Sequence, residues 1–527
     1  MGRNTRRRGL LRKVLGLAVL LAALALLAGG GRHGESLQAV SGQPGGSVAL
    51  AQSPQGLTIG LLLPFTGLLS EFGPAMQNGA NLAALHINAA GGVLGEPVVL
   101  VPADTQTDPQ AAVVAAQSLI DDGVDAIVGA AASGVTLAVA GQVTIPSQVL
   151  LISPASTSPA ITDLADDDLV FRTVNSDELQ APILAQVAWG LGFQTACTMY
   201  LNNAYGQGLS ASFTEAFQAL GGTVQVQVPH GDQSSYLAEL QQCTSGNPDV
   251  LAGMSYPQHG LVYLDEALDN ALIDQFVFAD GLKSQDMFDE LGAANFEGMY
   301  GTSPTSGSTA EFSSAYEAQY GEPPPLPYIA ETYDAVVSIA LAAERAGSTD
   351  SAAIRDAMRS VACPPGPSIG AGAAPIAQAV QLVAAGQSVN YEGATGSLEF
   401  TEYGDDRRGM VEIWKIESGQ IVTDREEPVA TRTDADDDGF DACVEDYVGT
   451  DFLDGCPDNS SDDAWPPDIN KDTWVSILDV LLFKPVIVSD VGDPNYDPRF
   501  DLNADESISI LDVLLYKPVI MTQCVNP

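Results

Sequence analysis

LTIGLLLPFTG, residues 57–67, is a nearly continuous apolar run that ends at a proline and a glycine. Apolar residues that do not alternate with polar ones are typical of a strand covered on both faces of its sheet. The next segment, AMQNGANLAALHINAAGG at 75–92, has apolar residues at helical spacing and stops at glycine. The ordered part of the chain is therefore predicted to begin with a buried strand and a helix.

The same alternation continues along the chain in two series. The first series predicts strands at 97–104, 124–130 and 148–156 and a helix at 109–123. The second series predicts strands at 195–201, 223–229, 248–255 and 275–280, with helices at 208–222, 236–246 and 260–271 between them. Alternating units of this kind form parallel sheets flanked by helices, so we predict an α/β fold with two lobes. Ligands of such sheets bind beyond the carboxyl ends of the strands.

The composition argues against one class of partner. The formal net charge is −46, and nucleic acid binding needs clustered lysine and arginine. The acidity has two open explanations, which are cation sites and solubility in a salty habitat.

The first residues are typical of an exported protein. Basic residues crowd positions 3–13, and an apolar run too short for a membrane span follows at 14–28. We predict a signal peptide at 1–28 and a flexible spacer rich in Gly, Ser and Gln at 29–55. Export permits disulfides. The sequence favours a Cys443–Cys456 bridge and allows Cys197–Cys243, although spacing does not fix the connectivity.

Seven motifs occur in a familiar order after the spacer. They are GLLLPFTGLLSEFG from Gly60, INAAGGVLGEPV from Ile87, VGAAASG from Val128, LISPASTSP from Leu151, YGQGL from Tyr205, YIAETYDAV from Tyr328 and YEGATGSLEF from Tyr391. Together they resemble the leucine/isoleucine/valine-binding family, the type I periplasmic solute-binding proteins of ABC importers. The resemblance implies a periplasmic-binding-protein type I fold over 56–425, in which two lobes close on a small solute.

The resemblance also implies how an amino acid is held. Ser133 and Thr157 match hydroxyl positions that face the ligand carboxylate, and Ser156 matches a position whose backbone is used. Asp280 stands where the family places an acid against the amino group, although a glutamate is commoner there. Without the order of the motifs, these hydroxyls would be ordinary turn and cap groups.

Aromatic residues complete the expected ligand site. Phe72 matches a residue of the first lobe that covers the ligand, and Tyr205 matches an aromatic wall of the second lobe. Ser255 or Tyr256 adds a contact in this interpretation. Tyr333 is open between packing and binding.

An acidic segment follows the solute-binding domain. DADDDGFDACVE, residues 434–445, matches the calcium-loop pattern D-x-D-x-D-G-x5-E. Its predicted Ca²⁺ ligands are Asp434, Asp436, Asp438, Glu445 and the carbonyl of Phe440, in a linker at 434–458.

The chain ends on two near-copies of one segment, DINKDTWVSILDVLLFKPVI from Asp468 and DLNADESISILDVLLYKPVI from Asp501. Each copy has oxygen ligands at calcium-loop spacing, followed by a short apolar helix, and the pair resembles a dockerin repeat at 466–524. Thr473 and Glu506 replace the usual glycine at position 6. The predicted Ca²⁺ ligands are Asp468, Asn470, Asp472, Trp474 through its carbonyl, Ser476, Asp479, Asp501, Asn503, Asp505, Ser507 through its carbonyl, Ser509 and Asp512. We expect the two helices to pack on each other and to end before Lys-Pro.

The function that these residues favour is delivery of an amino acid or related small amide to an ABC permease by an exported periplasmic or cell-surface protein. The C-terminal module would bind calcium and attach the chain to a surface or a cohesin-like partner. Two alternatives stay open: a receptor that senses the solute without transport, and a component of a surface assembly. No HExxH or P-loop motif occurs and the four histidines are scattered, so an enzyme is not expected.

Overall fold

The computed structural model describes residues 56–523 except 305–307, 364, 397, 402, 431–442, 444–447, 449, 451–464, 472–473, 503–506 and 520–521. The predicted signal peptide, the spacer, Cys456 and Cys524 lie outside these residues. In the described part of the chain, no helix has both the length and the apolar character needed to cross a membrane.

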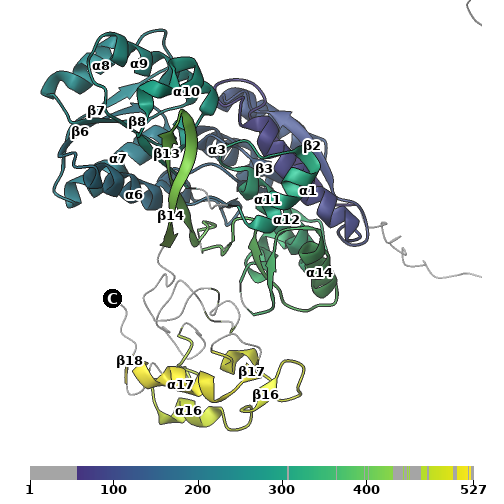
Figure 1. Cartoon of the computed structure of the whole chain (residues 1–527). Helices are drawn as coiled ribbons and strands as arrows, with labels where there is room; N and C mark the ends of the chain where they lie inside the picture. Colours follow the sequence, from purple (N-terminus) through teal and green to yellow (C-terminus); the bar gives the residue numbers. More distant parts are fainter. Residues whose placement is uncertain are drawn as a thin grey trace, which may run out of the picture. The chain divides into compact units, whose positions relative to one another are not determined.

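The first lobe is built on a parallel sheet in the order β2-β1-β3-β4-β5. Strands β2 and β3 of this sheet are labelled in Figure 1. Its strands are β1 Thr58–Leu63, β2 Val99–Asp104, β3 Ala126–Gly129, β4 Leu150–Ser153 and β5 Val170–Arg172. The helices and small strands of this lobe are α1 Gly73–Ala89, α2 Pro109–Asp121, α3 Ser133–Val139, α4 Ile145–Ser147, α5 Pro159–Thr162, α11 Ala310–Tyr320, α12 Ile329–Ala346, α13 Ser351–Ala357, β11 Ser368–Gly370, α14 Ala373–Ala384 and β12 Asn390–Gly393.

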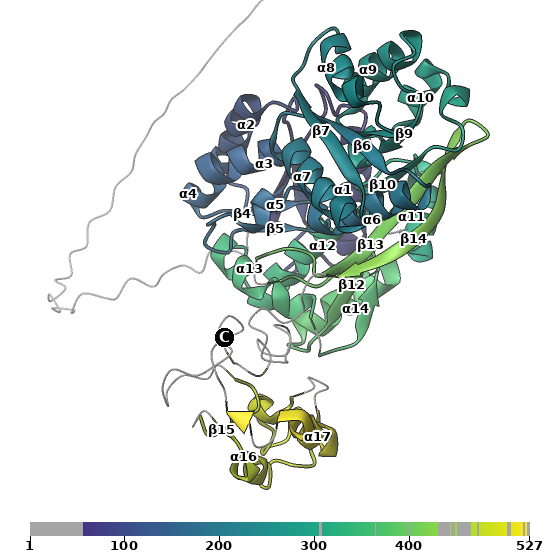
Figure 2. The same ribbon diagram turned by 90° about the vertical axis from the view of Figure 1, so that its left-hand side faces the viewer.

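The second lobe has a sheet in the order β14-β13-β10-β9-β8-β6-β7. Its elements are α6 Asp177–Gly190, β6 Thr195–Leu201, α7 Ala204–Ala219, β7 Thr223–His230, α8 Leu237–Cys243, β8 Val250–Met254, α9 Pro257–Asp269, β9 Phe276–Phe278, α10 Gln285–Leu291, β10 Tyr300–Ser303, β13 Arg408–Glu417 and β14 Gln420–Ala430. β6 to β10 are parallel, whereas β13 and β14 add an antiparallel ribbon at one edge (Figure 2). The chain passes between the lobes after β5, after β10 and before β13. The predicted α/β fold with two lobes is confirmed.

Local sequence signals explain where several of these elements lie. The apolar run at the start becomes β1, whose residues 59–63 are all buried because helices cover both faces of the sheet. α2 begins where Asp108 caps the backbone N–H of Ala111 at 2.7 Å and Pro109 occupies the first helical position. Local signals of this kind fix where strands end and helices begin, and the ligand-facing loops of both lobes follow the carboxyl ends of the strands.

The disulfides are only partly as predicted. Cys197 at β6 pairs with Cys243 at the end of α8, as the sequence allowed. Cys443 pairs with Cys363, 80 residues away, and not with Cys456. The prediction of a Cys443–Cys456 bridge is therefore wrong, because it rested on the short loop alone and the fold brings a distant cysteine within 5.5 Å between Cα atoms.

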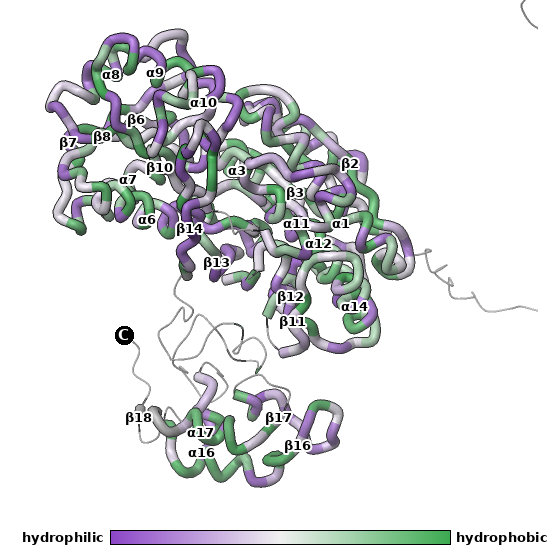
Figure 3. Tube along the Cα trace, in the orientation of Figure 1, coloured by the Kyte–Doolittle hydropathy of each residue, from purple (hydrophilic) through white to green (hydrophobic). Residues whose placement is uncertain are grey.

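The C-terminal module repeats one small unit. A short strand and a helix occur in each copy, β15 Trp474–Val475 with α16 Ile477–Leu482 and β17 Ser507–Ile508 with α17 Ile510–Val519. β15 pairs with β18 Thr522–Gln523, and β16 Ser489–Asp490 pairs with β17. The helices are coloured mainly as hydrophobic in Figure 3.

The two helices pack on each other, as expected from the repeat. The rings of Phe483 and Tyr516, equivalent positions of the two copies, lie 5.6 Å apart edge to face. α16 ends before Lys484–Pro485, but α17 runs through Lys517–Pro518 to Val519, so the expected helix end is correct only for the first copy.

Candidate functional site

A cavity lies between the two lobes at the carboxyl ends of their strands, with an empty volume of about 340 Å³. Loops after β3 and β4 approach it from the first lobe, and loops after β6, β8 and β9 approach it from the second. Its lining is mainly apolar and aromatic and includes one acid; the lining residues are Leu69, Phe72, Ala131, Ala132, Ser133, Ala155, Tyr205, Tyr256, Asp280, Gly281 and Tyr328. Such a lining suits a small ligand with an apolar part and few polar groups.

Asp280 is the acid of the cavity, and three side chains hold its carboxylate. The Tyr205 hydroxyl donates to Oδ1 at 3.0 Å, Gln180 Nε2 donates to the same oxygen at 3.1 Å, and the Tyr328 hydroxyl donates to Oδ2 at 2.5 Å. Burial raises the pKa of Asp280, and these hydrogen bonds oppose the rise. Tyr205 comes from the second lobe and Tyr328 from the first, so the carboxylate lies at the junction of the lobes.

A second buried acid, Asp177, interacts with Asp280. Asp177 is fully buried at the start of α6, and neither carboxylate oxygen has a hydrogen-bond partner among the described residues. Burial raises the pKa of Asp177 well above its ordinary value, and the charge of Asp280 raises it further. The Thr157 hydroxyl and Arg172 oppose this rise, although Thr157 is not placed for a hydrogen bond of good geometry. Two adjacent carboxylates in a closed space favour a cationic group between them.

Sequence analysis did not find Asp177. Its local signal is weak: the segment FRTVNSDEL, residues 171–179, begins inside β5 and becomes mainly polar after it. Tyr328 begins the motif YIAETYDAV, and the motif alone predicts no binding role for it. It has a left-handed backbone, with φ 76° and ψ 8°, at the start of α12. This conformation costs a non-glycine residue about 1–2 kcal/mol, and here it lets the phenol reach Asp280.

Two hydroxyl side chains of the first lobe are candidates for a ligand carboxylate: Ser133 lines the cavity, and Thr157 lies in the loop after β4, whose Ala155 lines it. The Ser133 hydroxyl oxygen accepts the N–H of Ser158 at 3.2 Å, so its own O–H remains available toward the cavity. The Thr157 hydroxyl is buried without a hydrogen-bond partner in the described part of the chain. An oxygen-bearing ligand group would satisfy both hydroxyls.

Ser156 is placed differently from Ser133. Its N–H donates to Ser153 Oγ at 3.0 Å, and its hydroxyl contacts the carbonyls of Ala130 and Ala131, both at 3.1 Å. Ser156 therefore supports the loops from behind and does not line the cavity.

The expected aromatic walls come together around the cavity. The rings of Tyr205 and Tyr256 are stacked with centroids 5.5 Å apart, and Phe72 lies 6.4 Å from Tyr328. Tyr256 therefore lines the cavity, whereas Ser255 is turned away and its Oγ lies 2.6 Å from His230 Nε2. Tyr333 packs outside the cavity, where its hydroxyl contacts His86 Nδ1 at 2.8 Å and the N–H of Gly372 at 3.1 Å.

The C-terminal module buries the acids at both ends of its two loops. Asp468, Asp479, Asp501 and Asp512 are at most 1 % exposed. Asp479 Oδ1 accepts the N–H of Asn470 at 3.1 Å and Oδ2 accepts the N–H of Ser476 at 2.9 Å, so the first loop wraps around the carboxylate at position 12. The second loop repeats this contact, with the N–H of Ser509 donating to Asp512 Oδ2 at 2.7 Å.

Buried carboxylates need a cation, and a donor set rich in carboxylate oxygens fits Ca²⁺. Some predicted ligands lie outside the described residues: Asp434, Asp436, Asp438, Phe440, Glu445, Asp472, Asn503 and Asp505. Within the described residues, no three or more His, Cys, Asp or Glu side chains form a group that could hold a metal.

Comparison with known proteins explains the cavity and the module. Residues 56–403 match the family described as periplasmic binding protein. The chain belongs to the periplasmic binding protein family. Residues 466–520 match the dockerin type I domain, a type of domain that generally binds calcium.

Two relatives match this periplasmic binding protein over most of their own length. A chemotactic signal transduction system substrate-binding protein, BasB of Halobacterium salinarum, is 30% identical over 357 residues, which are 66% of this chain and 84% of that protein. Leu/Ile/Val-binding protein homolog 3 of Brucella melitensis is 29% identical and covers 69% of this chain and 93% of its own length. Relatives of this kind are solute-binding proteins and not enzymes.

A solved structure supports the type I fold of this periplasmic binding protein. The leucine binding protein LivK of Thermotoga maritima superposes with a TM-score of 0.59 at 26% sequence identity, covering 70% of this chain and 98% of the other.

One feature of this periplasmic binding protein superficially resembles a catalytic pair. His230 Nε2 lies 2.6 Å from Ser255 Oγ, and His230 Nδ1 lies 3.1 Å from the Gly231 carbonyl. Nδ1 therefore carries the proton, and Nε2 accepts from the serine. Ser255 is fully buried and is not among the residues that line the cavity, and the His230 ring packs against Tyr236 and Tyr263.

The lobes of this periplasmic binding protein contact each other around the cavity. Ser158 Oγ donates to the Ala204 carbonyl at 2.9 Å, and Ser284 Oγ donates to Glu71 Oε2 at 3.1 Å. With the Tyr328–Asp280 contact, these bonds join the lobes on more than one side of the cavity. Closure of this kind excludes water and strengthens each polar contact inside.

Proposed function

We propose that this chain captures an amino acid with an apolar side chain, or a related small amide, and delivers it to an ABC permease. The observation that carries the proposal is Asp280, a buried carboxylate at one end of an otherwise apolar and aromatic cavity. A buried acid is costly unless a cation pairs with it, and the amino group of an amino acid supplies one. Relatives named as Leu/Ile/Val-binding and leucine binding proteins support the same ligand class.

The residues take separate roles in this proposal. Asp280 accepts a hydrogen bond from the ammonium, Asp177 adds negative charge behind it, and the hydroxyls of Ser133 and Thr157 donate to the carboxylate. Leu69 and the alanines after β3 and β4 face the apolar side chain. The tyrosines at 205, 256 and 328 and Phe72 enclose it.

A thermal-shift screen of the mature chain with amino acids, small amides and urea tests the proposal. Apolar L-amino acids should raise the melting temperature most, since a ligand at one hundred times its Kd stabilises the folded state by about 2.7 kcal/mol. Analogues that lack the amino group or the carboxylate should have much smaller effects. A larger shift from a carboxylic acid without an amino group would contradict the proposed role of Asp280.

Affinity for the amino acid is expected to fall on acidification. Burial raises the pKa of Asp280 and of Asp177, so these groups take up protons at a higher pH than an ordinary aspartate, whose pKa is about 3.9. The ammonium of the ligand stays charged throughout this range. Binding should therefore be strongest near neutral pH. It should weaken as the pH falls toward the raised pKa values, because the protonated acids no longer attract the ammonium of the ligand.

Titration calorimetry between pH 5 and pH 8 measures this dependence, with the melting temperature of the ligand-free protein followed in the same buffers. Constant affinity over that interval would show that neither acid titrates with binding.

Sensing without transport is the second candidate function, favoured by one observation. BasB, the relative from Halobacterium salinarum, is named for chemotactic signal transduction. Import requires that the loaded protein stimulate a permease and its ATPase in vesicles, whereas a receptor would leave ATP hydrolysis unchanged.

The C-terminal module is proposed to bind Ca²⁺ and to attach the exported chain to a cell-surface or cohesin partner. Its two copies expose equivalent apolar side chains on α16 and α17: Ile477, Leu478 and Leu481 in the first, and Ile510, Leu511 and Leu514 in the second. Contiguous exposed apolar residues are typical of a binding surface. Binding of the purified chain to an isolated type I cohesin, with calcium present, tests the attachment, and no binding would remove cohesin as the partner.

A further inference from the structure

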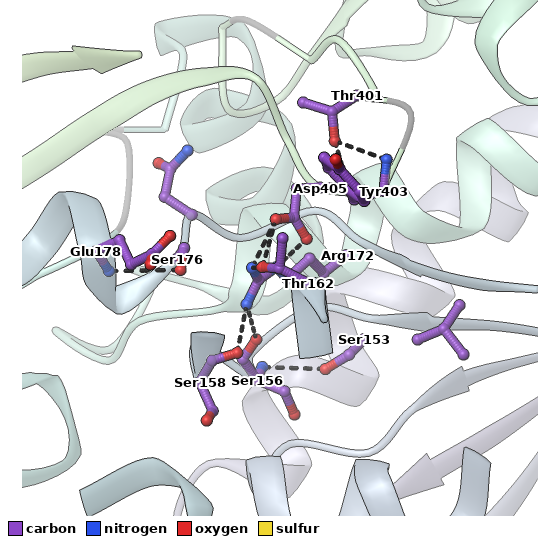
Figure 4. Close-up of polar contacts among 12 residues, drawn as sticks. Ser153, Ser156, Ser158, Thr162, Arg172, Ser176, Glu178, Thr401, Tyr403 and Asp405 are labelled. Atoms are coloured by element: carbon purple, nitrogen blue, oxygen red, sulfur yellow. Dashed lines mark hydrogen bonds and ion pairs between the residues drawn. The ribbon is translucent and has the colours of Figure 1, made fainter. Parts of the chain in front are cut away.

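Arg172, the last residue of β5, is a fully buried cation close to the cavity. Its guanidinium makes a two-pronged ion pair with Asp405, with Nε 2.6 Å from Oδ1 and Nη2 2.8 Å from Oδ2 (Figure 4). Nη2 also donates to Thr162 Oγ1 at 2.6 Å. Asp405 lies in the segment that leads back to the second lobe before β13.

The remaining contacts of Arg172 point to the loop after β4. Nη1 donates to the carbonyl of Ser158 at 3.0 Å and to the carbonyl of Ser156 at 3.3 Å (Figure 4). These carbonyls flank Thr157 on both sides. Because the guanidinium is a rigid planar fork, fixing it against Asp405 also fixes the direction of these two carbonyls.

The loop that Arg172 holds borders the cavity through Ala155 and contacts Ser133, which also lines the cavity. The N–H of Ser158 donates to Ser133 Oγ, which leaves the Ser133 proton free for a ligand. The Thr157 carbonyl accepts the N–H of Asp177 at 2.8 Å, and the Thr157 hydroxyl has no hydrogen-bond partner within the described residues. A displacement of Ser156 or Ser158 would therefore shift the Thr157 hydroxyl and the Ser158 N–H that holds Ser133.

Stability alone does not account for such a residue. A buried ion pair often contributes little net stability, because desolvation of both charges offsets their attraction. The pair of Arg172 and Asp405 does, however, fix one geometry, and every hydrogen bond of Nη1 goes to the ligand-facing loop.

We propose that Arg172 is a positioning residue for solute binding. Held by Asp405, it fixes the carbonyls of Ser156 and Ser158, the residues on either side of Thr157, so that Ser133 and Thr157 present their hydroxyls to the carboxylate of the bound amino acid. This inference rests on the proposed function and adds a residue that does not touch the ligand.

The test compares two ligands on the mature chain by competition calorimetry. L-leucine has the carboxylate, and L-leucinol keeps the ammonium and the apolar side chain but replaces the carboxylate with a hydroxymethyl group. Arg172→Lys keeps the charge and loses the fork, so leucine affinity should fall by about tenfold or more while leucinol affinity changes by less than about twofold. A merely structural role would lower both affinities by the same factor, and that result would overturn the proposal.

Arg359→Lys is the matched control. Arg359 also forms a two-pronged pair with an aspartate, Asp168, in the first lobe, and it donates to the Thr401 carbonyl rather than to the cavity loop. This variant should change the melting temperature without changing the ratio of leucine to leucinol affinity. An equal change of the ratio in both variants would refute a specific role of Arg172.

Asp405→Asn keeps the test decisive if Arg172→Lys does not fold. It loosens the guanidinium without removing it, and a selective loss of leucine affinity of about threefold or more is expected, with unchanged leucinol affinity. Unchanged affinity for both ligands would overturn the proposal. If the wild-type chain binds no amino acid at all, the proposed function itself fails, and that outcome is distinct from equal loss of both ligands in the variants.

Discussion

Replacement of Asp280 by asparagine is expected to weaken binding of the preferred amino acid by about 100-fold or more, equivalent to roughly 2.7 kcal/mol. The amide has nearly the shape of the carboxylate, so the hydroxyls of Tyr205 and Tyr328 keep a polar group within hydrogen-bond distance. The negative charge is lost, and the ammonium of the ligand is then buried without an adequate partner. Titration calorimetry on the mature chain with the best ligand measures the loss.

The ligand-free protein should respond in the opposite direction. Without a ligand, Asp280 is a buried acid close to a second buried acid, and removing its charge relieves that repulsion. The melting temperature of Asp280→Asn without ligand should therefore stay the same or rise. A fall in affinity together with a lower melting temperature would indicate damage to the fold instead.

Two further variants locate the ammonium. Asp274→Asn, on the exposed surface of the same lobe, should bind the amino acid as the wild type does. Asp177→Asn should cost less than Asp280→Asn, since Asp280 lines the cavity and Asp177 lies behind it. A larger loss for Asp177→Asn would place the ammonium against Asp177.

The α/β lobes could be predicted because each strand and helix carries its signal locally. The segment TACTMYL has the local pattern of a buried strand, and β6 has the predicted bounds, Thr195–Leu201. The ribbon of β13 and β14 was not predicted from its residues. It completes a sheet otherwise made of segments more than 100 residues earlier in the chain, such as β6 and β8, and its alternating pattern had no predicted neighbour.

In the candidate site, too, residues with a local sequence signal could be predicted and residues defined by distant contacts could not. Phe72, Ser133, Tyr205, Tyr256 and Asp280 follow predicted strands or motifs, and they do line one cavity. Asp177 and Arg172 were not found, because their roles depend on contacts with residues about 100 and 230 positions away, which no local pattern records. The bridge of Cys363 with Cys443 is hidden for the same reason.

Removal of calcium is expected to unfold the C-terminal module and leave the two lobes intact. The module buries four loop acids, and its apolar core is small, centred on Val475, Phe483, Ile508 and Tyr516. Such a core does not offset both the ordering entropy of the chain and the desolvation of the buried carboxylates. Ion binding therefore contributes directly to the folding free energy of the module.

Hydrogen exchange of the whole chain, with calcium and then with chelator, measures this effect segment by segment. Amide protection in α16 and α17 should fall by about 100-fold or more after chelation, while α12, which is buried along most of its length, serves as the internal control and keeps its protection. Unchanged protection of α16 and α17 would show that packing alone holds the repeat together.

Single variants separate the two loops. Asp468→Ala should lower protection more than Asp501→Ala. Both loops lack the glycine of the calcium pattern at the turn position, but Glu506 of the second loop is a larger departure from it than Thr473 of the first, so the second loop is expected to bind its ion more weakly from the start. Asp490→Asn, an exposed acid between the copies, is the matched control and should change nothing. Because the helices meet through Phe483 and Tyr516, loss of one loop should also loosen the helix of the other. If each variant loosens only its own helix, the two loops bind their ions independently and the duplicated unit does not fold as a pair.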